Sequence, residues 1–432
     1  MKYLFLLSFA LIINMHPAYA QSKSLAAEVA ATAMATLWKV PVGADTAKPT
    51  KWTYDQSFGL LGIERLWIQT ANPAYFSYLQ NSINYFISEN GDIKFHKVQD
   101  YDIDNILFGR ILLSLYNVTG QVKYYKAASL LRDQLKAQLS KNAGILYMGA
   151  PFYAAYAKQF HEPEAFDDIA NRFIRMEQHA RDAKTGLYEM ALVDVLENFP
   201  VTHPKHDTLV SILKRRANAI KKLQDPSTGI FVYANAKAVR LGFLPASYLA
   251  VSKKGYDGIL KQFIDTSKEG YANLKGTLSG DPNGVGVFIL AATEMEWHLL
   301  PKPGKNKVFL LDDYYNAEKK KDIKGVEYAY HYKWPEMYNN GFSFLGNIIT
   351  TNGLQTKTLS QAPTAGNLKN ASIYMIVDAD NIADNPTPNY MNDRDAQEIY
   401  NWVKAGGVLV LFHNDKPNAD FIAINKLSDL FG

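Results

Sequence analysis

The sequence contains no cysteine and no apolar run long enough to span a membrane. Without cysteine the chain has no disulfides, no thiol nucleophile, and no thiolate ligands for zinc or iron–sulfur clusters. Its 46 Lys and Arg against 42 Asp and Glu give a net charge of +4 without a basic cluster, so no nucleic-acid partner is expected. The glycine-rich nucleotide-binding motifs, the zinc-protease motif and the serine-hydrolase motif are also absent.

The composition is that of a folded protein with a large core. Hydrophobic residues make up 47% of the 432 residues and charged residues 20%, which excludes an intrinsically disordered chain. The length predicts two or three domains. Aromatic residues reach 13%, with 27 Tyr and 6 Trp, which is typical of proteins that bind sugars or pack aromatic cores.

Residues 1–20 have the pattern of a cleavable signal peptide. Lys2 is a short basic region, residues 3–15 are apolar, and Ala18-Tyr19-Ala20 is a cleavage signal of the small-x-small type. An apolar stretch of this length is too short for a membrane anchor. We therefore expect a periplasmic or secreted protein that has no membrane contact after cleavage.

Residues 21–300 predict one helix after another. Apolar residues recur with a helical period, and the pattern Asp-x-x-Thr-Gly ends two helices, at 182–186 and 225–229. About twelve helices in pairs favour a toroid of helical hairpins. An open α-solenoid that binds a protein partner is the alternative.

Residues 301–432 predict a second, α/β domain, flavodoxin-like or amidotransferase-like and incomplete. Uninterrupted apolar segments alternate with helical ones, which is typical of a buried parallel sheet. The expected strands are 307–311, 354–359, 372–377 and 408–412, and the expected helices are 335–349 and 393–404.

Three segments of the helical region suggest chemistry. Asp100, Asp102 and Asp104 precede a predicted helix, where carboxylates either cap the helix or supply a general acid at the mouth of a toroid. Trp52 and Tyr54 open another helix, either as a hydrophobic staple or as a platform for a sugar ring. His203 and His206 have a spacing that suits a metal but lack a third ligand, so we expect a surface loop and no metal site.

Five segments, in one order along the chain, resemble unsaturated rhamnogalacturonyl hydrolases of glycoside hydrolase family 105, relatives of the unsaturated glucuronyl hydrolases of family 88. They lie at 52–59, 101–104, 113–120, 146–152 and 191–197. The resemblance covers about residues 25–298 and implies an (α/α)6 barrel and a hydrolase that needs no cofactor. Residues 305–432 resemble the α/β extension of some Bacteroidetes members.

The resemblance also implies a mechanism and a set of site residues. An aspartic acid protonates C4 of an unsaturated galacturonyl residue, water adds at C5, and the hemiketal collapses to release a rhamnose-terminated product. Asp104 matches a cavity aspartate of the family, and Tyr54 and Trp52 match its aromatic entry motif. Gly144 occupies the position of the family's principal acid, and four segments that supply the cavity are shortened.

The shortened segments leave other interpretations open. Under these interpretations the chain is not an active hydrolase. It is instead a carbohydrate-binding protein without turnover, a helical interaction scaffold, or a scaffold that does not fold stably. An incorrectly assembled reading frame explains the same shortening.

Overall fold

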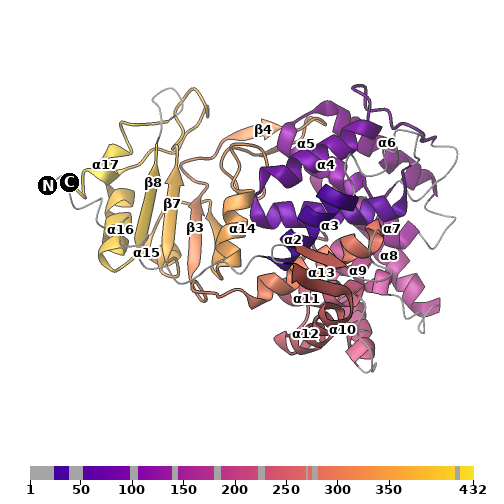
Figure 1. The fold of residues 1–432 in the computed structure, drawn as a ribbon. Coiled ribbons are helices and arrows are strands. Elements are labelled where there is room, and N and C mark those ends of the chain that lie inside the picture. The colour runs from indigo at the N-terminus through magenta and orange to yellow at the C-terminus, as the bar shows by residue number, and fades with distance from the viewer. Residues whose placement is uncertain are drawn as a thin grey trace.

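The computed structural model describes residues 24–37, 52–97, 106–138, 145–179, 186–221, 229–268, 271–274, 281–413 and 419–432. Over these residues the chain forms a helical part, which ends at Leu299, and a smaller α/β part, which begins at Val308 (Figure 1). Among the described helices, none is both long and apolar enough to cross a membrane. The expected signal peptide lies outside the described residues.

Six helices form an inner ring. Each packs on the next, and the last returns to pack closely on the first, so the ring is closed. The closure excludes the open solenoid and confirms the helical toroid. The six are α3 (Tyr54–Thr70), α5 (Gly109–Thr119), α7 (Ile145–Gln159), α9 (Gly186–Leu196), α11 (Gly229–Arg240) and α13 (Pro282–Leu299).

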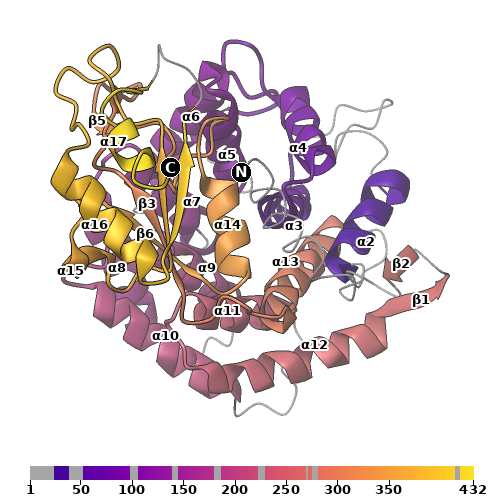
Figure 2. The same cartoon turned by 90° about the vertical axis from the view of Figure 1, so that its left-hand side faces the viewer.

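A second set of helices surrounds this ring, as Figure 2 shows. The outer helices are α2 (Leu25–Thr32), α4 (Pro73–Phe86), α6 (Val122–Gln138), α8 (Glu164–His179), α10 (His206–Lys221) and α12 (Leu249–Phe263). A π-helical segment, η1 (Ala33–Leu37), follows α2, and a 3-10 helical turn, η3 (Ala246–Tyr248), precedes α12. The sequence did not predict the antiparallel pair β1 (Ile264–Lys268) and β2 (Tyr271–Leu274), because neither strand alternates apolar and polar residues. The arrangement is an (α/α)6 barrel.

The closing contact between α13 and α3 depends on two glycines. A Cβ at Gly286 would lie 2.1 Å from the carbonyl oxygen of Phe58, and a Cβ at Gly62 would lie 2.8 Å from that of Gly286. Any larger residue would therefore push the two backbones apart. The sequence at these two positions sets how closely the first and last inner helices meet.

The α/β part has a four-stranded parallel sheet, as the sequence predicted, and the structure shows the strand order β6-β3-β7-β8. Its strands are β3 (Val308–Asp312), β6 (Gln355–Leu359), β7 (Ile373–Val377) and β8 (Val408–Phe412). Its helices are α14 (Ser343–Thr351), α15 (Ala365–Leu368), α16 (Asp393–Lys404) and α17 (Asn425–Ser428). The helix predicted at 335–349 begins only at Ser343, and a charged hairpin of β4 (Lys319–Lys321) and β5 (Glu327–Ala329) is additional.

The two parts meet at the carboxyl-terminal ends of inner helices. The ring of Phe344 on α14 lies 5.0 Å from that of Trp67 near the end of α3, and Asn347 donates a hydrogen bond to the carbonyl of Ile68 at 2.9 Å. Lys324, in the β4–β5 turn, pairs with Glu162 just beyond α7 at 3.0 Å. The α/β part therefore covers the end of the barrel at which these inner helices finish (Figure 1).

Candidate functional site

A pocket lies at the amino-terminal ends of the inner helices, away from the α/β part. The residues that line it belong to α3, α5, α7 and α9, together with Leu107 just before α5, so one pocket gathers side chains from four inner helices. The residues that line it are Tyr54, Phe58, Leu107, Arg110, Tyr147, Pro151, Leu187, Met190, Ala191 and Asp194. Among the described residues that line it, most are aromatic or aliphatic, and the charged groups are the guanidinium of Arg110 and the carboxylate of Asp194.

The structure separates the roles of the two aromatic residues at the start of α3. Thr53 and Gln56 form a capping box that begins the helix and places Tyr54 in the pocket wall, with its ring 4.8 Å from that of Phe58. Trp52 is only 1% exposed, and its indole donates to the hydroxyl of Ser57 at 2.7 Å. Its ring packs against those of Phe86 and Phe108, so Trp52 is a core residue and its face is not open to a sugar.

An ion pair between Arg110 and Asp194 forms the polar side of the pocket. Nη1 of Arg110 lies 2.6 Å from Oδ2 of Asp194. The other carboxylate oxygen accepts from the hydroxyl of Tyr233 at 2.8 Å and from Nζ of Lys237 at 2.5 Å. Side chains of two other helices, α5 and α11, thus hold the carboxylate of Asp194. Of these partners, Arg110 lines the pocket and is partly exposed.

The same ion pairing continues through the barrel interior. Lys237 also pairs with Glu197 at 2.8 Å, and Arg240 pairs with Glu294 at 2.7 Å. Arg65 reaches Glu294 at 3.1 Å, which returns the chain of charges to α3. Opposite charges alternate along this chain, so each buried ion has a partner.

These contacts set the protonation of the buried groups. Burial by itself raises the pKa of Asp194, but Lys237 and Arg110 outweigh it and hold that pKa below its usual range. The pKa of Glu197 is likewise far below normal, because Lys237 and Arg240 overcome the effect of burial. Both carboxyls are ionised at neutral pH. Asp194 therefore orients Arg110 but has no proton to give to a substrate.

Another carboxyl of α9 has the opposite behaviour. Burial raises the pKa of Glu189 to about 8, and Arg216 only partly opposes it. Glu189 is 3% exposed, and one of its oxygens has no hydrogen-bond partner. It does not line the pocket, where α9 presents Leu187, Met190 and Ala191 instead. Glu189 is thus a protonated interior residue.

The predicted acid and its neighbours lie outside the described residues. Asp100, Asp102 and Asp104 belong to the segment 98–105, and Gly144 to the segment 139–144. In sequence, Asp104 precedes the pocket residue Leu107 by three positions, and Gly144 precedes Tyr147 by three. The role of Asp104 stays a prediction.

The two histidines with metal-like spacing pair with carboxylates. Nε2 of His203 lies 3.8 Å from Asp167, and Nδ1 of His206 lies 3.1 Å from Asp207. Throughout the described ranges, no group of three or more His, Asp and Glu side chains is placed to hold a metal ion.

Sequence reasoning missed Arg110, Lys237 and the importance of Asp194. The available signal was a charged residue within an otherwise apolar helix, as in the segment 191–197, since such a residue is almost never buried without a partner. The partner of Asp194 could not be identified, because Lys237 lies 43 positions away and only the ring geometry joins them.

Comparisons with known proteins agree with this architecture. Residues 26–189 and 188–299 match Glycosyl Hydrolase Family 88, well over half of the chain. The chain is similar to a solved glycoside hydrolase from family 105 of C. acetobutylicum ATCC 824, with 27% identity, a TM-score of 0.56, and coverage of 63% of this chain and 99% of the other.

Two further solved structures share the fold at lower identity. A possible family 105 member from Salmonella enterica serovar Paratyphi A is 16% identical, with a TM-score of 0.52 and coverage of 64% of this chain and 94% of the other. A possible family 105 member from Klebsiella pneumoniae is 15% identical, with a TM-score of 0.52 and coverage of 66% and 96%.

Proposed function

This chain belongs to glycosyl hydrolase family 88, and from that premise we propose that it removes an unsaturated galacturonyl residue from rhamnose in rhamnogalacturonan oligosaccharides. The observation that supports this substrate is Arg110, which with its partner Asp194 forms the charged side of the pocket, while the other described lining residues are aromatic or aliphatic. On the basis of residues 1–20 we also propose that the enzyme acts in the periplasm or outside the cell.

Arg110 suits the carboxylate of a uronyl ring. A guanidinium has five N–H donors in a planar fork, and the bond to Asp194 uses one of them. Asp194 fixes the orientation of the guanidinium before the substrate arrives, which lowers the entropy lost on binding. Tyr54 and Tyr147 add aromatic surface against which the ring of the sugar can pack.

The proposed reaction is hydration of the enol ether. A carboxylic acid gives its proton to C4 of the unsaturated ring, and the electron-poor C5 then takes up water, which loses a proton. The resulting C5 hemiketal opens to a ketone and leaves a hemiacetal at C1. The C1–O bond to rhamnose then breaks, the hemiacetal hydroxyl gives up its proton as C1 becomes an aldehyde, the rhamnose oxygen takes up a proton, and the other product is a keto-uronate. Asp194 is ionised and Gly144 has no side chain, so Asp104 is the acid that we propose.

Turnover is measured as loss of ultraviolet absorbance from an unsaturated galacturonyl–rhamnose disaccharide. We expect Asp104→Asn to lower the rate by about 10²–10⁴, the usual contribution of a general acid. Asp100→Asn makes the same chemical change four positions earlier and should retain the wild-type rate. An Asp104→Asn protein as active as wild type would refute the assignment of the acid.

The second candidate function is carbohydrate binding without turnover. It is favoured by the described part of the pocket, whose one carboxylate, Asp194, is held ionised by Lys237 and Arg110. Saturable binding of the disaccharide by folded wild-type protein, with no loss of absorbance, would select this function over hydrolysis.

A further inference from the structure

The ion pairs of the barrel interior form a chain that does not close on itself. Each carboxylate in it joins two cations, and a cation stands at both ends. In order, the chain runs through Arg65, Glu294, Arg240, Glu197, Lys237, Asp194 and Arg110. Four cations therefore share three carboxylates, and the chain carries one positive charge in excess.

Glu64 lies between the two ends of this chain. It is the neighbour of Arg65 on α3, and it interacts electrostatically with both Arg65 and Arg110. It is 6% exposed, and the hydroxyl of Ser114, one turn along α5 from Arg110, donates a hydrogen bond to it. Within the described part of the chain, Ser114 is its hydrogen-bond partner and no ion pair includes it. Glu64 is thus the carboxyl that could balance the excess charge.

The contacts of Glu64 suit either protonation state. A hydroxyl can donate to a carboxylate and can accept from a carboxylic acid, so the bond to Ser114 survives when Glu64 takes up a proton. Burial raises the pKa of Glu64, and Arg110, Ser114 and Arg65 oppose this only in part. Glu64 therefore binds a proton at a higher pH than an exposed glutamate does.

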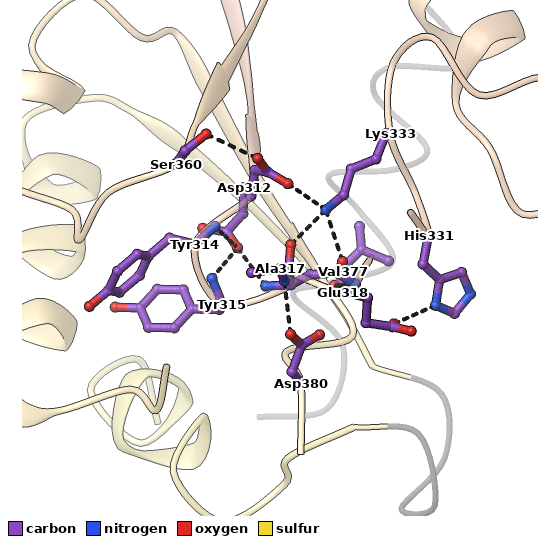
Figure 3. A network of polar contacts seen from close by, with 12 residues as sticks. Asp312, Tyr314, Tyr315, Ala317, Glu318, His331, Lys333, Ser360, Val377 and Asp380 are labelled. Atoms are coloured by element: carbon purple, nitrogen blue, oxygen red, sulfur yellow. Dashed lines mark hydrogen bonds and ion pairs between the residues drawn. The ribbon is translucent and has the colours of Figure 1, made fainter. Parts of the chain in front are cut away.

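A buried carboxyl of the α/β part shows what an ionised group needs when it has no direct ion pair among the described residues (Figure 3). Oδ2 of Asp312 accepts from the backbone N–H groups of residues 314–316, and its Oδ1 accepts from the hydroxyl of Tyr374. Even with these four donors, burial raises its pKa to about 6. Glu64 has one donor, so its ionised form depends on the charges of the two nearby arginines.

The protonation of Glu64 decides how much positive charge Arg110 offers to the pocket. With Glu64 ionised, four carboxylates balance four cations. With Glu64 protonated, one positive charge is left over, and Arg110 is the cation of the chain that lines the pocket. An anion that binds at Arg110 and the negative charge of Glu64 therefore disfavour each other, because like charges near one cation repel.

We propose that Glu64, acting through Arg110, sets the preference of the pocket for an anionic sugar: its protonated form leaves the charge of Arg110 to the carboxylate of the ligand. The inference rests on the proposed function for the uronyl class of that ligand, and it concerns binding and not turnover. The coupling is reciprocal, so the bound anion favours the protonated form. Binding is then accompanied by uptake of a proton from the solvent, at most one for each ligand.

The other charged groups around Glu64 do not take up this proton. They are Arg65 of α3 itself, Arg110 of α5, Glu197 just beyond α9, and Glu294 of α13, which pairs with Arg65. Helices α4 and α14 also pack on α3 and contain no charged residue, and Glu28 of α2 acts on Glu296. Their cation partners hold the pKa values of Glu197 and Glu294 below the usual range, so both stay ionised near neutral pH.

The test is calorimetric titration of the full chain with the saturated galacturonyl–rhamnose disaccharide. This ligand lacks the double bond that the proposed reaction consumes, so it stays intact. The control ligand is its methyl ester, which has no negative charge. We expect the affinity of wild type for the acid to fall about tenfold between about pH 5 and 9, because a tenfold change corresponds to a difference of one unit in the pKa of Glu64 between free and bound protein. The affinity for the ester should not vary.

Two variants assign the effect to Glu64. Glu64→Gln fixes an uncharged side chain of the same shape, whose amide can still bond to Ser114. It should bind the acid equally well at every pH, with the affinity that wild type shows at low pH. Glu189→Gln is the matched control, since Glu189 is also a buried carboxyl of raised pKa but acts with Arg216 and does not line the pocket. It should keep the wild-type pH profile.

A second measurement needs no variant and decides the matter if Glu64→Gln does not fold. Heats of binding to wild type, compared in buffers of different ionisation enthalpy, should show proton uptake with the acid and none with the ester. The proposal is overturned if no proton is taken up with the acid, or if wild type does not bind the acid. A pH dependence that persists in Glu64→Gln overturns it as well.

Failure of this inference can be distinguished from failure of the proposed function. The calorimetry follows binding of a ligand that is not turned over, and the absorbance assay follows turnover. Proton-linked binding without loss of absorbance from the unsaturated disaccharide would refute hydrolysis alone. Loss of absorbance together with binding that does not vary with pH would refute the role of Glu64 alone.

Discussion

Replacing Lys237 with methionine tests whether the ion pairs hold the barrel together. Lys237 is 2% exposed, and its Nζ contacts Asp194 at 2.5 Å, Glu197 at 2.8 Å and Tyr233 at 3.0 Å. Methionine fills a similar volume but leaves two buried carboxylates short of one cation. Arg110 still reaches Asp194, and Arg240 is 3.6 Å from Glu197, so neither carboxylate becomes wholly isolated.

The expected loss of stability is large. Removing one partner of a buried ion pair typically costs about 3–5 kcal/mol, because the remaining charge is uncompensated. At about 2–4 °C per kcal/mol for a domain of this size, the melting temperature should fall by roughly 6–20 °C. The matched control is Lys253→Met on α12, whose lysine is exposed and pairs with exposed Asp257. That change should cost less than about 1 kcal/mol.

The pH dependence gives an independent check. The pKa values of Asp194 and Glu197 are depressed in the folded protein, so these groups stabilise it above about pH 4, and this stabilisation is lost as pH falls through their folded pKa values. In Lys237→Met both pKa values rise, and the carboxyls are protonated at a higher pH. The stability difference from wild type, measured by chemical denaturation, should therefore be largest at pH 7 and shrink toward pH 4. A loss below about 1 kcal/mol, or one that does not vary with pH, would refute the reasoning.

Three other changes have defined outcomes. The pKa of Glu189 is raised to about 8 in the folded protein, whereas the unfolded chain ionises this group from about pH 4.5. Wild type should therefore lose stability as pH rises from about 4.5 to 8, and Glu189→Gln should not. Equal pH profiles of the two proteins in chemical denaturation would contradict this. Gly286→Ala should cost about 1–3 kcal/mol in thermal melts, because the added methyl meets the backbone of Phe58, and an unchanged melt would show that α13 can shift freely. Tyr54→Ala should raise KM for the disaccharide about tenfold, which corresponds to about 1.4 kcal/mol. Tyr54→Phe, which keeps the ring, should have a smaller effect. An unchanged KM in Tyr54→Ala would show that Tyr54 does not contact the substrate.

Local periodicity allowed most of the helices and strands to be predicted. Helix α16 has the bounds 393–404 that its sequence predicts, because Asn392 caps its start and apolar residues repeat on one face. The strand β4 could not be predicted, since Lys319-Lys320-Lys321 has no apolar residue and pairs only through its hairpin.

The candidate site was less accessible to sequence reasoning. Tyr54 was predicted because an aromatic pair stands at the start of a predicted helix and matches the aromatic entry motif of family 105, and the structure places it in the pocket wall. Trp52 shows the limit of that reasoning, since the same segment directs one ring into the pocket and its neighbour into the core. The pairing of Asp194 with Arg110 and Lys237 depends on the mutual rotation of three inner helices, which no local pattern specifies.

The most direct test compares rhamnose release from two disaccharides that differ only in the double bond between C4 and C5. Hydration of the enol ether requires that bond, whereas direct displacement at C1 does not. The account predicts rhamnose release from the unsaturated galacturonyl–rhamnose disaccharide, in step with the loss of ultraviolet absorbance, and none from its saturated counterpart. Release from the saturated disaccharide, or no release from either by folded protein, would contradict it.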